Sequence, residues 1–237
     1  MDSSRLFSPL SLALAAGISI FVSGCSMNAD EELPPGKMAL ASEEREQPSR
    51  SLKELRTIVE ELNPKIGVYP PKFESEEDKL HVYALWSDAF VDAKAFLQSA
   101  GNAESVLWTA AELARQGHNM DIDQTGMIAS QTIEKCLTNF PRSVICHFSA
   151  ADYYVSIRVT PQSVKQLRRS LDFLKKRLAP KVHQGVEEKY VQLYLYEGKT
   201  DAARKQLEKC LKMFPKSQNK EQLLALRAEL TGSKKRN

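Results

Sequence analysis

The chain has 237 residues, of which 42% are hydrophobic and 27% are charged, and its formal net charge is +3. So small a positive charge disfavours nucleic-acid binding, which typically needs a strongly basic domain. Residues 51–237 are numerous enough to bury one sizeable hydrophobic core.

Residues 1–25 have the pattern of a bacterial export signal. Arg5 carries a positive charge near the start, an apolar stretch runs from Leu10 to Val22, and small residues precede Cys25. The stretch is shorter than the ~20 residues that a membrane-spanning helix needs. We therefore expect a cleaved signal. An ordinary secretory signal, in which Cys25 has no role, is the alternative interpretation.

The tetrapeptide Val22-Ser23-Gly24-Cys25 resembles the processing site of bacterial lipoproteins. The resemblance implies a lipid on the Cys25 thiol and an acylated amine after cleavage, so membrane lipid is an expected partner. Several acyl chains would make this anchoring effectively permanent. Lipoproteins kept in the inner membrane typically carry Asp after the cysteine, whereas this chain has Ser26. The resemblance thus favours a cell-envelope protein at the outer membrane, facing the periplasm.

Residues 26–50 are predicted to form a disordered acidic tether. They contain Pro34-Pro35-Gly36 and Pro48, and six acidic residues stand against three basic ones. Such a composition cannot bury enough apolar surface to fold.

Beyond residue 50 the pattern is helical, and alternating strand patterns are nearly absent. Ser51 and Glu54 form a capping box ahead of an apolar face, and Asn63-Pro64 is expected to end this helix. Ser75 is expected to begin a longer helix that ends at Ala100-Gly101. Residues 51–103 are therefore assigned to N-terminal helices.

A repeat follows. The segment from Ile133 to Pro141 recurs from Leu207 to Pro215, 74 residues later, and a further helix end from Phe173 to Pro180 lies about halfway between them. Spacings close to 37 residues are typical of stacked helix pairs.

The segment from Glu187 to Pro215 resembles the tetratricopeptide repeat. Its matching residues are Tyr194, Gly198, Ala203, Leu207, Cys210 and Pro215. The resemblance implies an all-α fold of irregular, tetratricopeptide-like helix-pair repeats (an α-solenoid). Three units would occupy residues 104–216, the first interrupted by a loop from Gly117 to Gln124. Glu221–Leu230 would be the capping helix, so that the repeat region spans residues 104–232.

The segment Glu104-Ser105-Val106-Leu107-Trp108, following a lipid signal and preceding irregular repeats, is also similar to the repeat lipoproteins associated with TRAP-type solute transporters. This resemblance implies a periplasmic partner such as a solute-binding protein.

The cysteines and histidines do not form a recognisable metal or catalytic motif. Cys136 and Cys210 occupy equivalent repeat positions and are expected to be buried free thiols, although Cys146 lies close enough to Cys136 for a bridge. No two of the four histidines are three or four residues apart, so no zinc site of the paired-spacing type is predicted. Each histidine is expected at the surface or at a helix end. They are His81, His118, His147 and His183.

No enzyme activity or cofactor is expected. Glu104-Ser105 resembles the acid–serine pair of helical lytic transglycosylases, but the glycine- and glutamine-bearing motif of those enzymes does not follow it. A helix start with a favourable negative charge is the simpler interpretation.

One helix is expected to be strongly basic, and a solvated face is the default interpretation, with anionic lipid or an acidic partner as the alternative. Its cations are Lys165, Arg168, Arg169, Lys175, Lys176 and Arg177, with Lys181 beyond and Lys234-Lys235-Arg236 at the end of the chain.

In a tetratricopeptide-like fold, the first helix of each pair lines a concave groove. The residues expected there are aromatic, charged or amide-bearing, which suits the binding of a peptide or protein. We therefore predict a lipid-anchored interaction module or scaffold with an envelope or periplasmic protein partner. The alternative is a lipoprotein that binds a small ligand in an apolar pocket enclosed by Trp86, Trp108 and Tyr153. The predicted groove residues are Phe148, Asp152, Glu188, Lys189, Gln192 and Tyr196.

Overall fold

The computed structural model describes residues 45–157 and 159–232. The chain divides into two units, 1–36 and 37–237, and every described residue belongs to the second. The predicted signal with Cys25, and most of the predicted tether, lie outside the described residues. No described helix is long and apolar enough to cross a membrane.

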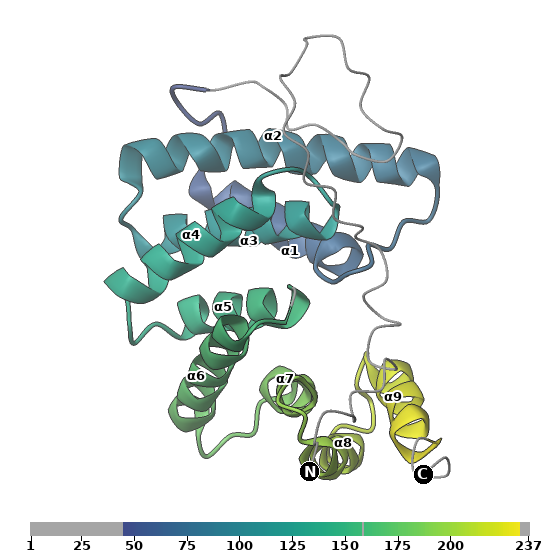
Figure 1. Ribbon diagram of the computed structural model, residues 1–237. Coiled ribbons are helices and arrows are strands. Elements are labelled where there is room, and N and C mark those ends of the chain that lie inside the picture. The colour runs from purple at the N-terminus through teal and green to yellow at the C-terminus, as the bar shows by residue number, and fades with distance from the viewer. Residues whose placement is uncertain (1–44, 158, 233–237) are drawn as a thin grey trace, which may run out of the picture. The chain divides into compact units, whose positions relative to one another are not determined.

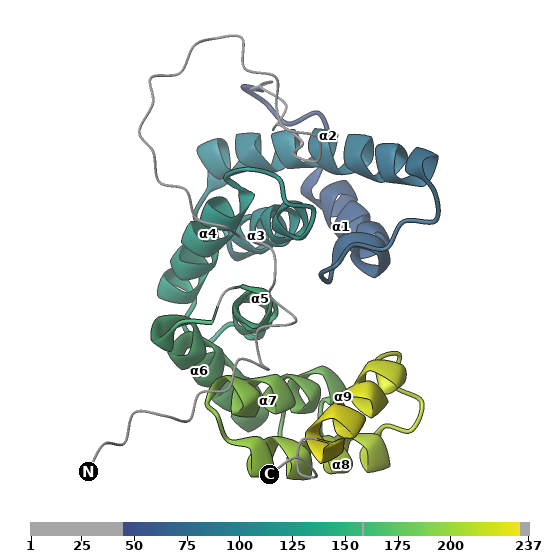
Figure 2. The same cartoon turned by 45° about the vertical axis from the view of Figure 1, so that its right-hand side comes forward.

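The described part of the chain is all-α, with nine helices and no strand (Figure 1), as predicted. Consecutive helices pair closely, α3 with α4, α5 with α6, and α7 with α8, while α2 packs along α1 and α3 (Figure 2). The helices are α1 (Leu52–Ile66), α2 (Glu76–Ala100), α3 (Glu104–Asn119), α4 (Thr125–Asn139), α5 (Val144–Ser156), α6 (Pro161–Leu178), α7 (Gln184–Tyr196), α8 (Thr200–Met213) and α9 (Lys220–Gly232).

The first helix begins as predicted but ends later. The Ser51 side chain accepts a hydrogen bond from the Glu54 backbone N–H, and Glu54 reaches back to the Ser51 backbone, which completes the capping box. The expected end at Asn63-Pro64 is wrong, because α1 continues through Pro64 to Ile66. Pro64 has no N–H to donate. The turn after it still forms, because the backbone N–H of Gly67 bonds the Asn63 carbonyl at 2.9 Å.

The second helix has the predicted bounds, since Ser75 caps its start and Gly101 follows its last residue. The loop predicted from Gly117 to Gln124 starts later than expected, because α3 includes Gly117 and runs to Asn119. The backbone of Gly117 lies so close to the buried Trp86 that no side chain fits between them. A Cβ on Gly117 would lie 2.4 Å from Cζ2 of Trp86.

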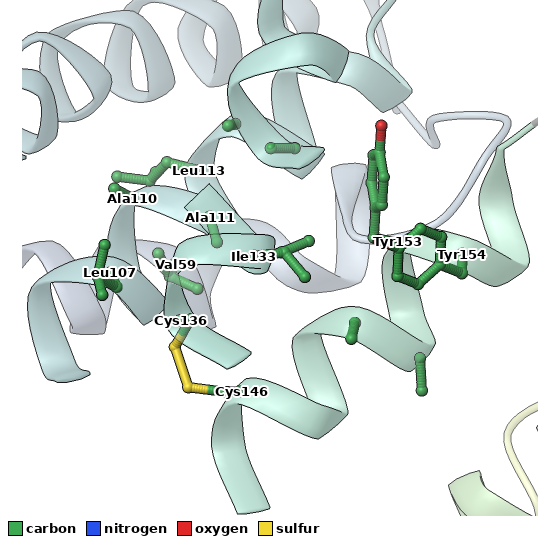
Figure 3. Close-up of a cluster of buried hydrophobic side chains, with 14 of the residues drawn as sticks. Val59, Leu107, Ala110, Ala111, Leu113, Ile133, Cys136, Cys146, Tyr153 and Tyr154 are labelled. Atoms are coloured by element: carbon green, nitrogen blue, oxygen red, sulfur yellow. A yellow bond between two sulfur atoms is a disulfide. The ribbon is translucent and has the colours of Figure 1, made fainter. Parts of the chain in front are cut away.

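The main hydrophobic core joins α1 through α7. Small side chains on α3, Ala110 and Ala111, lie in the same buried cluster as Ile133 of α4 and Tyr153 and Tyr154 of α5 (Figure 3). Alanines at this position let two helices approach closely. A second, smaller cluster holds α7, α8 and α9 together, and its members are Val191, Ala203, Leu207, Cys210 and Leu223.

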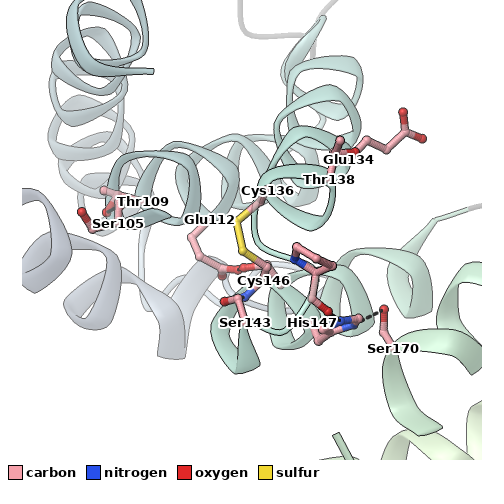
Figure 4. The surroundings of a disulfide bond; sticks show 12 residues. Ser105, Thr109, Glu112, Glu134, Cys136, Thr138, Ser143, Cys146, His147 and Ser170 are labelled. Atoms are coloured by element: carbon pink, nitrogen blue, oxygen red, sulfur yellow. Dashed lines mark hydrogen bonds between the residues drawn. A yellow bond between two sulfur atoms is a disulfide. The ribbon is translucent and has the colours of Figure 1, made fainter. Parts of the chain in front are cut away.

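A disulfide bond joins Cys136 on α4 to Cys146 on α5, with their Cα atoms 5.7 Å apart (Figure 4). The expectation that Cys136 is a free thiol is therefore wrong. The turn between α4 and α5 places the two residues within bonding range, which their separation of ten residues alone left open. Cys210 is a buried free thiol as predicted, and burial raises its pKa to about 11.

Candidate interaction surface

The first helices of the three pairs are neighbours. α5 contacts α3 on one side and α7 on the other, although α4 and α6 separate them in the chain. We name the partly exposed side chains of α3, α5 and α7 that lie along this row the first-helix face. It contains most of the predicted groove residues.

Asp152 on α5 and Lys189 on α7 meet at the centre of the first-helix face. The Lys189 ammonium lies 2.6 Å from the Asp152 carboxylate, and the Lys189 and Asp152 side chains are 21% and 35% exposed. Desolvation raises the pKa of Asp152, but the charges of Lys189 and Arg115 outweigh it, so that the pKa is lowered overall. The structure therefore brings these two predicted residues together as an ion pair.

Aromatic side chains flank this pair. Phe148, half-buried, contacts the ring of His183 with ring centroids 4.9 Å apart. The Tyr196 hydroxyl donates a hydrogen bond of 2.7 Å to the carbonyl of Val155 on α5. Gln192 is half-buried, about one helical turn beyond Lys189.

Glu188 does not lie on the exposed face, contrary to the prediction. Its side chain is buried, and its carboxylate accepts hydrogen bonds from Gln184, Ser217 and Asn219. The segment between α8 and α9 turns back onto α7, and this contact between distant parts of the chain removes Glu188 from solvent. Its role is to hold that segment in place.

A buried charged network beneath the face was not predicted. The Arg115 guanidinium donates to the Glu112 carboxylate at 2.7 Å and to the Gly67 carbonyl, and Ser149 of α5 donates to the other oxygen of Glu112. Both charged side chains are less than 10% exposed. The spacing of Glu112 and Arg115, three residues apart on one helix, was the available signal. It does not distinguish a buried pair from an exposed one.

At the α1 end of the face, Arg56 lies over the ring of Trp108, 5.1 Å from the ring centroid. An open depression on α1 adjoins this contact and is lined by Leu52, Lys53, Arg56, Thr57 and Glu60. The face therefore has a cationic and aromatic end.

The three aromatic residues expected to enclose an apolar pocket all belong to the main core or pack against it. Trp86 is fully buried, stacks on Phe90 with ring centroids 5.1 Å apart, and donates its indole N–H to the Leu113 carbonyl at 2.8 Å. Trp108 contacts Arg56, and Tyr153 donates to the Gly126 carbonyl at 2.8 Å. Each of the three rings thus has a hydrogen-bonding or cationic partner of its own.

The end of the predicted tether is bound to α2. The Ser49 backbone N–H and hydroxyl donate to the buried Asp92, and both Arg45 and Arg50 pair with Asp88 and Asp92. Hydrogen bonds from these arginines lower the pKa of Asp88, and the bonds to Asp92 lower its pKa against the effect of desolvation. The boundary at residue 50 is therefore wrong, because residues 45–50 belong to the folded unit.

His147 differs from its predicted surface or helix-end position. It is buried in α5, stacks on Phe173 with ring centroids 3.8 Å apart, and contacts Ser170 and the Pro141 carbonyl (Figure 4). Burial lowers its pKa, as does the charge of Arg169. Within residues 45–157 and 159–232, no group of three or more histidine, cysteine or acidic residues is arranged to hold a metal ion.

The first-helix face thus combines an ion pair, aromatic rings and an amide. The buried charged network described above lies beneath it. Groups of this kind can orient and bury an extended or helical peptide segment. In comparisons with known proteins, no family model, no curated protein and no solved structure matches the chain.

Proposed function

We propose that the chain is a lipid-anchored protein-interaction module of the bacterial cell envelope, attached through acylated Cys25 and facing the periplasm. It binds an envelope or periplasmic protein through the first-helix face and is not an enzyme. The observation that carries this proposal is the adjacency of α3, α5 and α7, which places Phe148, Asp152, Lys189 and Tyr196 along one row.

A tetratricopeptide-like arrangement is part of the proposal. The pairing of α3 with α4, α5 with α6 and α7 with α8 supports it, as do the buried small and large residues of α8, Ala203, Leu207 and Cys210. Gly198, between α7 and α8, has φ of +70°, a left-handed conformation that favours glycine at the turn. In this arrangement, α9 covers the end of the stack through its contact with α8.

The Cys136–Cys146 disulfide supports export from the cytoplasm. Disulfides persist in oxidising compartments, of which the bacterial periplasm is one, and are rare in the cytosol. This observation is independent of the residues that suggested a lipoprotein signal.

Crosslinking in intact cells tests the binding face. A photoreactive amino acid at Gln192, on the first-helix face, should capture a specific envelope protein. The same group at the exposed Met127 on α4 is the matched control and should not capture it. Equal capture from both positions would place binding elsewhere. Recovery of a solute-binding protein would support a role in TRAP-type transport, and recovery of components of another assembly would support a scaffold there.

The anchor has a separate test. Cys25→Ala should prevent lipid attachment and move the protein from the detergent-solubilised membrane fraction to the soluble fraction of the periplasm. Unchanged membrane attachment would contradict the lipoprotein interpretation.

A further inference from the structure

Positive charge is concentrated in one part of the sequence. Residues 161–216 contain fourteen lysines and arginines against six acidic residues, a net charge of +8 in a chain whose total is +3. This segment comprises α6, α7 and α8. The excess of positive charge is therefore confined to this segment, and the rest of the chain has a net negative charge.

Most of the acidic residues in this segment are already engaged with neighbours inside it. Glu187 pairs with Lys209 at 2.6 Å, Glu197 pairs with Arg168 at 2.6 Å, and the buried Glu188 accepts a hydrogen bond from Gln184. Asp201 pairs with Arg204 at 2.9 Å. The remaining cations must therefore be neutralised by solvent ions or by a partner.

Three of these cations form a stripe along α6. Lys165, Arg169 and Lys176 are spaced by four and seven residues, which places them within about 40° of one another around a helix of 3.6 residues per turn. All three are exposed and have no ion-pair partner among the described residues. We name these residues the α6 stripe. Asp172, the one acidic residue of α6, lies on the same side of the helix between Arg169 and Lys176. Its side chain is 57% exposed, accepts the Tyr190 hydroxyl at 2.6 Å and lies 4.0 Å from Arg168.

Further exposed groups lie near both ends of the helix, although not in line with the α6 stripe. Arg177 and Lys181 are exposed at and beyond the C-terminal end of α6. Val159, just before α6, and Val182, just after it, are each 46% exposed. Cations together with exposed apolar side chains are the combination that binds at the interface of an anionic membrane.

We infer that the α6 stripe binds a surface of anionic phospholipid headgroups. A row of three exposed cations, with Asp172 as the one acidic residue among them, suits a flat surface that offers phosphates everywhere, and needs no complementary pocket. The inference rests on the proposed anchor in one respect only, since the anchor would keep a membrane within reach. The stripe would then fix which side of the folded unit lies on the membrane, while the first-helix face remains the site for the protein partner.

Vesicle sedimentation tests this inference with the polypeptide of residues 26–237, which includes the whole of the folded unit. This polypeptide lacks Cys25, so that the result is independent of the lipid anchor. Vesicles of 30% phosphatidylglycerol in phosphatidylcholine should sediment the protein at low salt. Neutral phosphatidylcholine vesicles should not, and salt should weaken the binding. Equal binding to both kinds of vesicle, or binding indifferent to salt, would overturn the inference.

The variant Lys165→Glu/Arg169→Glu/Lys176→Glu should bind anionic vesicles about 100-fold more weakly, because each cation at such a surface contributes about a fivefold factor. The control Lys72→Glu/Lys135→Glu/Lys220→Glu changes the charge equally at exposed positions elsewhere and should lose less than about threefold. A loss of equal size in both variants would show that only net charge matters, which contradicts a specific stripe.

Two further measurements distinguish lipid binding by the α6 stripe from a loss of helical structure and from binding of an acidic protein. The variant Lys165→Gln/Arg169→Gln/Lys176→Gln keeps helix-forming residues and should also lose binding, with an unchanged circular dichroism spectrum. If the Glu variant binds vesicles normally but loses a protein crosslinked in cells, the α6 stripe serves an acidic protein and the lipid assignment fails.

Discussion

Lys189 on α7 and Asp152 on α5 form an ion pair of 2.6 Å between two helices that are separated in the chain by the whole of α6. The charge of the buried Arg115 also acts on Asp152. The first-helix face is therefore held together by charge at its surface as well as by apolar contacts beneath.

The Asp152–Lys189 pair should contribute modestly to stability. A double-mutant cycle of Asp152→Asn and Lys189→Met in urea should give a coupling energy of about 0.5–1 kcal/mol, because both side chains are partly exposed and solvent screens their charges. A coupling near zero would show that the pair does not persist in solution.

The same pair predicts a pH dependence. The pKa of Asp152 is lower in the folded state than in the unfolded state, where it is about 3.9. Its contribution is therefore fully present above the unfolded pKa and is lost as the pH falls through the folded pKa. The difference in unfolding free energy between the unmodified chain and Asp152→Asn should shrink below about pH 4. A constant difference down to about pH 3 would contradict this assignment.

Gly117→Ala should destabilise the chain by about 1–3 kcal/mol, although alanine favours helix more than glycine does. The added methyl group would overlap Trp86 and would also lie 2.9 Å from Thr125. Gly185→Ala on α7 is the matched control, because its Cβ would meet no atom closer than 3.6 Å. Urea unfolding followed by tryptophan fluorescence measures both. The prediction fails if the two substitutions have the same effect.

Glu112→Gln should lower the free energy of unfolding by about 3–5 kcal/mol, since it removes the paired counter-charge of the buried Arg115 and leaves only the charge of Asp152 to act on it. Ser149→Ala removes one hydrogen bond to the same carboxylate and should cost only about 1 kcal/mol. Denaturant titrations of the two variants should rank them in this order. Equal losses would mean that solvent reaches Arg115.

Reduction of the Cys136–Cys146 disulfide should lower the unfolding free energy by about 3 kcal/mol, the loop entropy of a short closed segment. Thermal unfolding with and without reductant measures this effect, and Cys136→Ser/Cys146→Ser should reproduce the reduced value. Alkylation of the denatured protein followed by mass spectrometry supplies the control, because both cysteines are buried in the folded state and, once exposed, should react only after reduction. Ready alkylation of both in the denatured, unreduced protein would rule out the bond.

Local signals in the sequence predicted much of the fold. The capping residues Ser51 and Ser75, the end of α2 at Gly101 and the position of α9 were all correct, because each depends on residues a few positions apart. The errors arose where distant segments meet. Asn119 donates to the Ile66 carbonyl, a bond across 53 residues that holds the last turn of α1 beyond Pro64.

For the candidate surface as well, features that depend on local spacing were predicted, and features that depend on contacts between distant segments were not. The repeat spacing placed Asp152 and Lys189 on first helices, and the structure shows that they are paired. The same spacing could not show that Ser217 covers Glu188, or that residues 45–50 bind Asp92, since both depend on how the chain returns to itself. The Glu112–Arg115 network was missed because charged residues with the same spacing also occur on exposed helix faces. Only the structure shows that this pair is buried.

The position of the disulfide also bears on how the chain withstands proteolysis. Cys136 and Cys146 lie on either side of the exposed turn at Pro141-Arg142. A protease that cut this turn would leave the two fragments joined, and the nicked protein would migrate as one species on a gel until it was reduced. A trypsin-like cut after Arg142 would therefore not separate the part of the chain before this turn from the helices that follow.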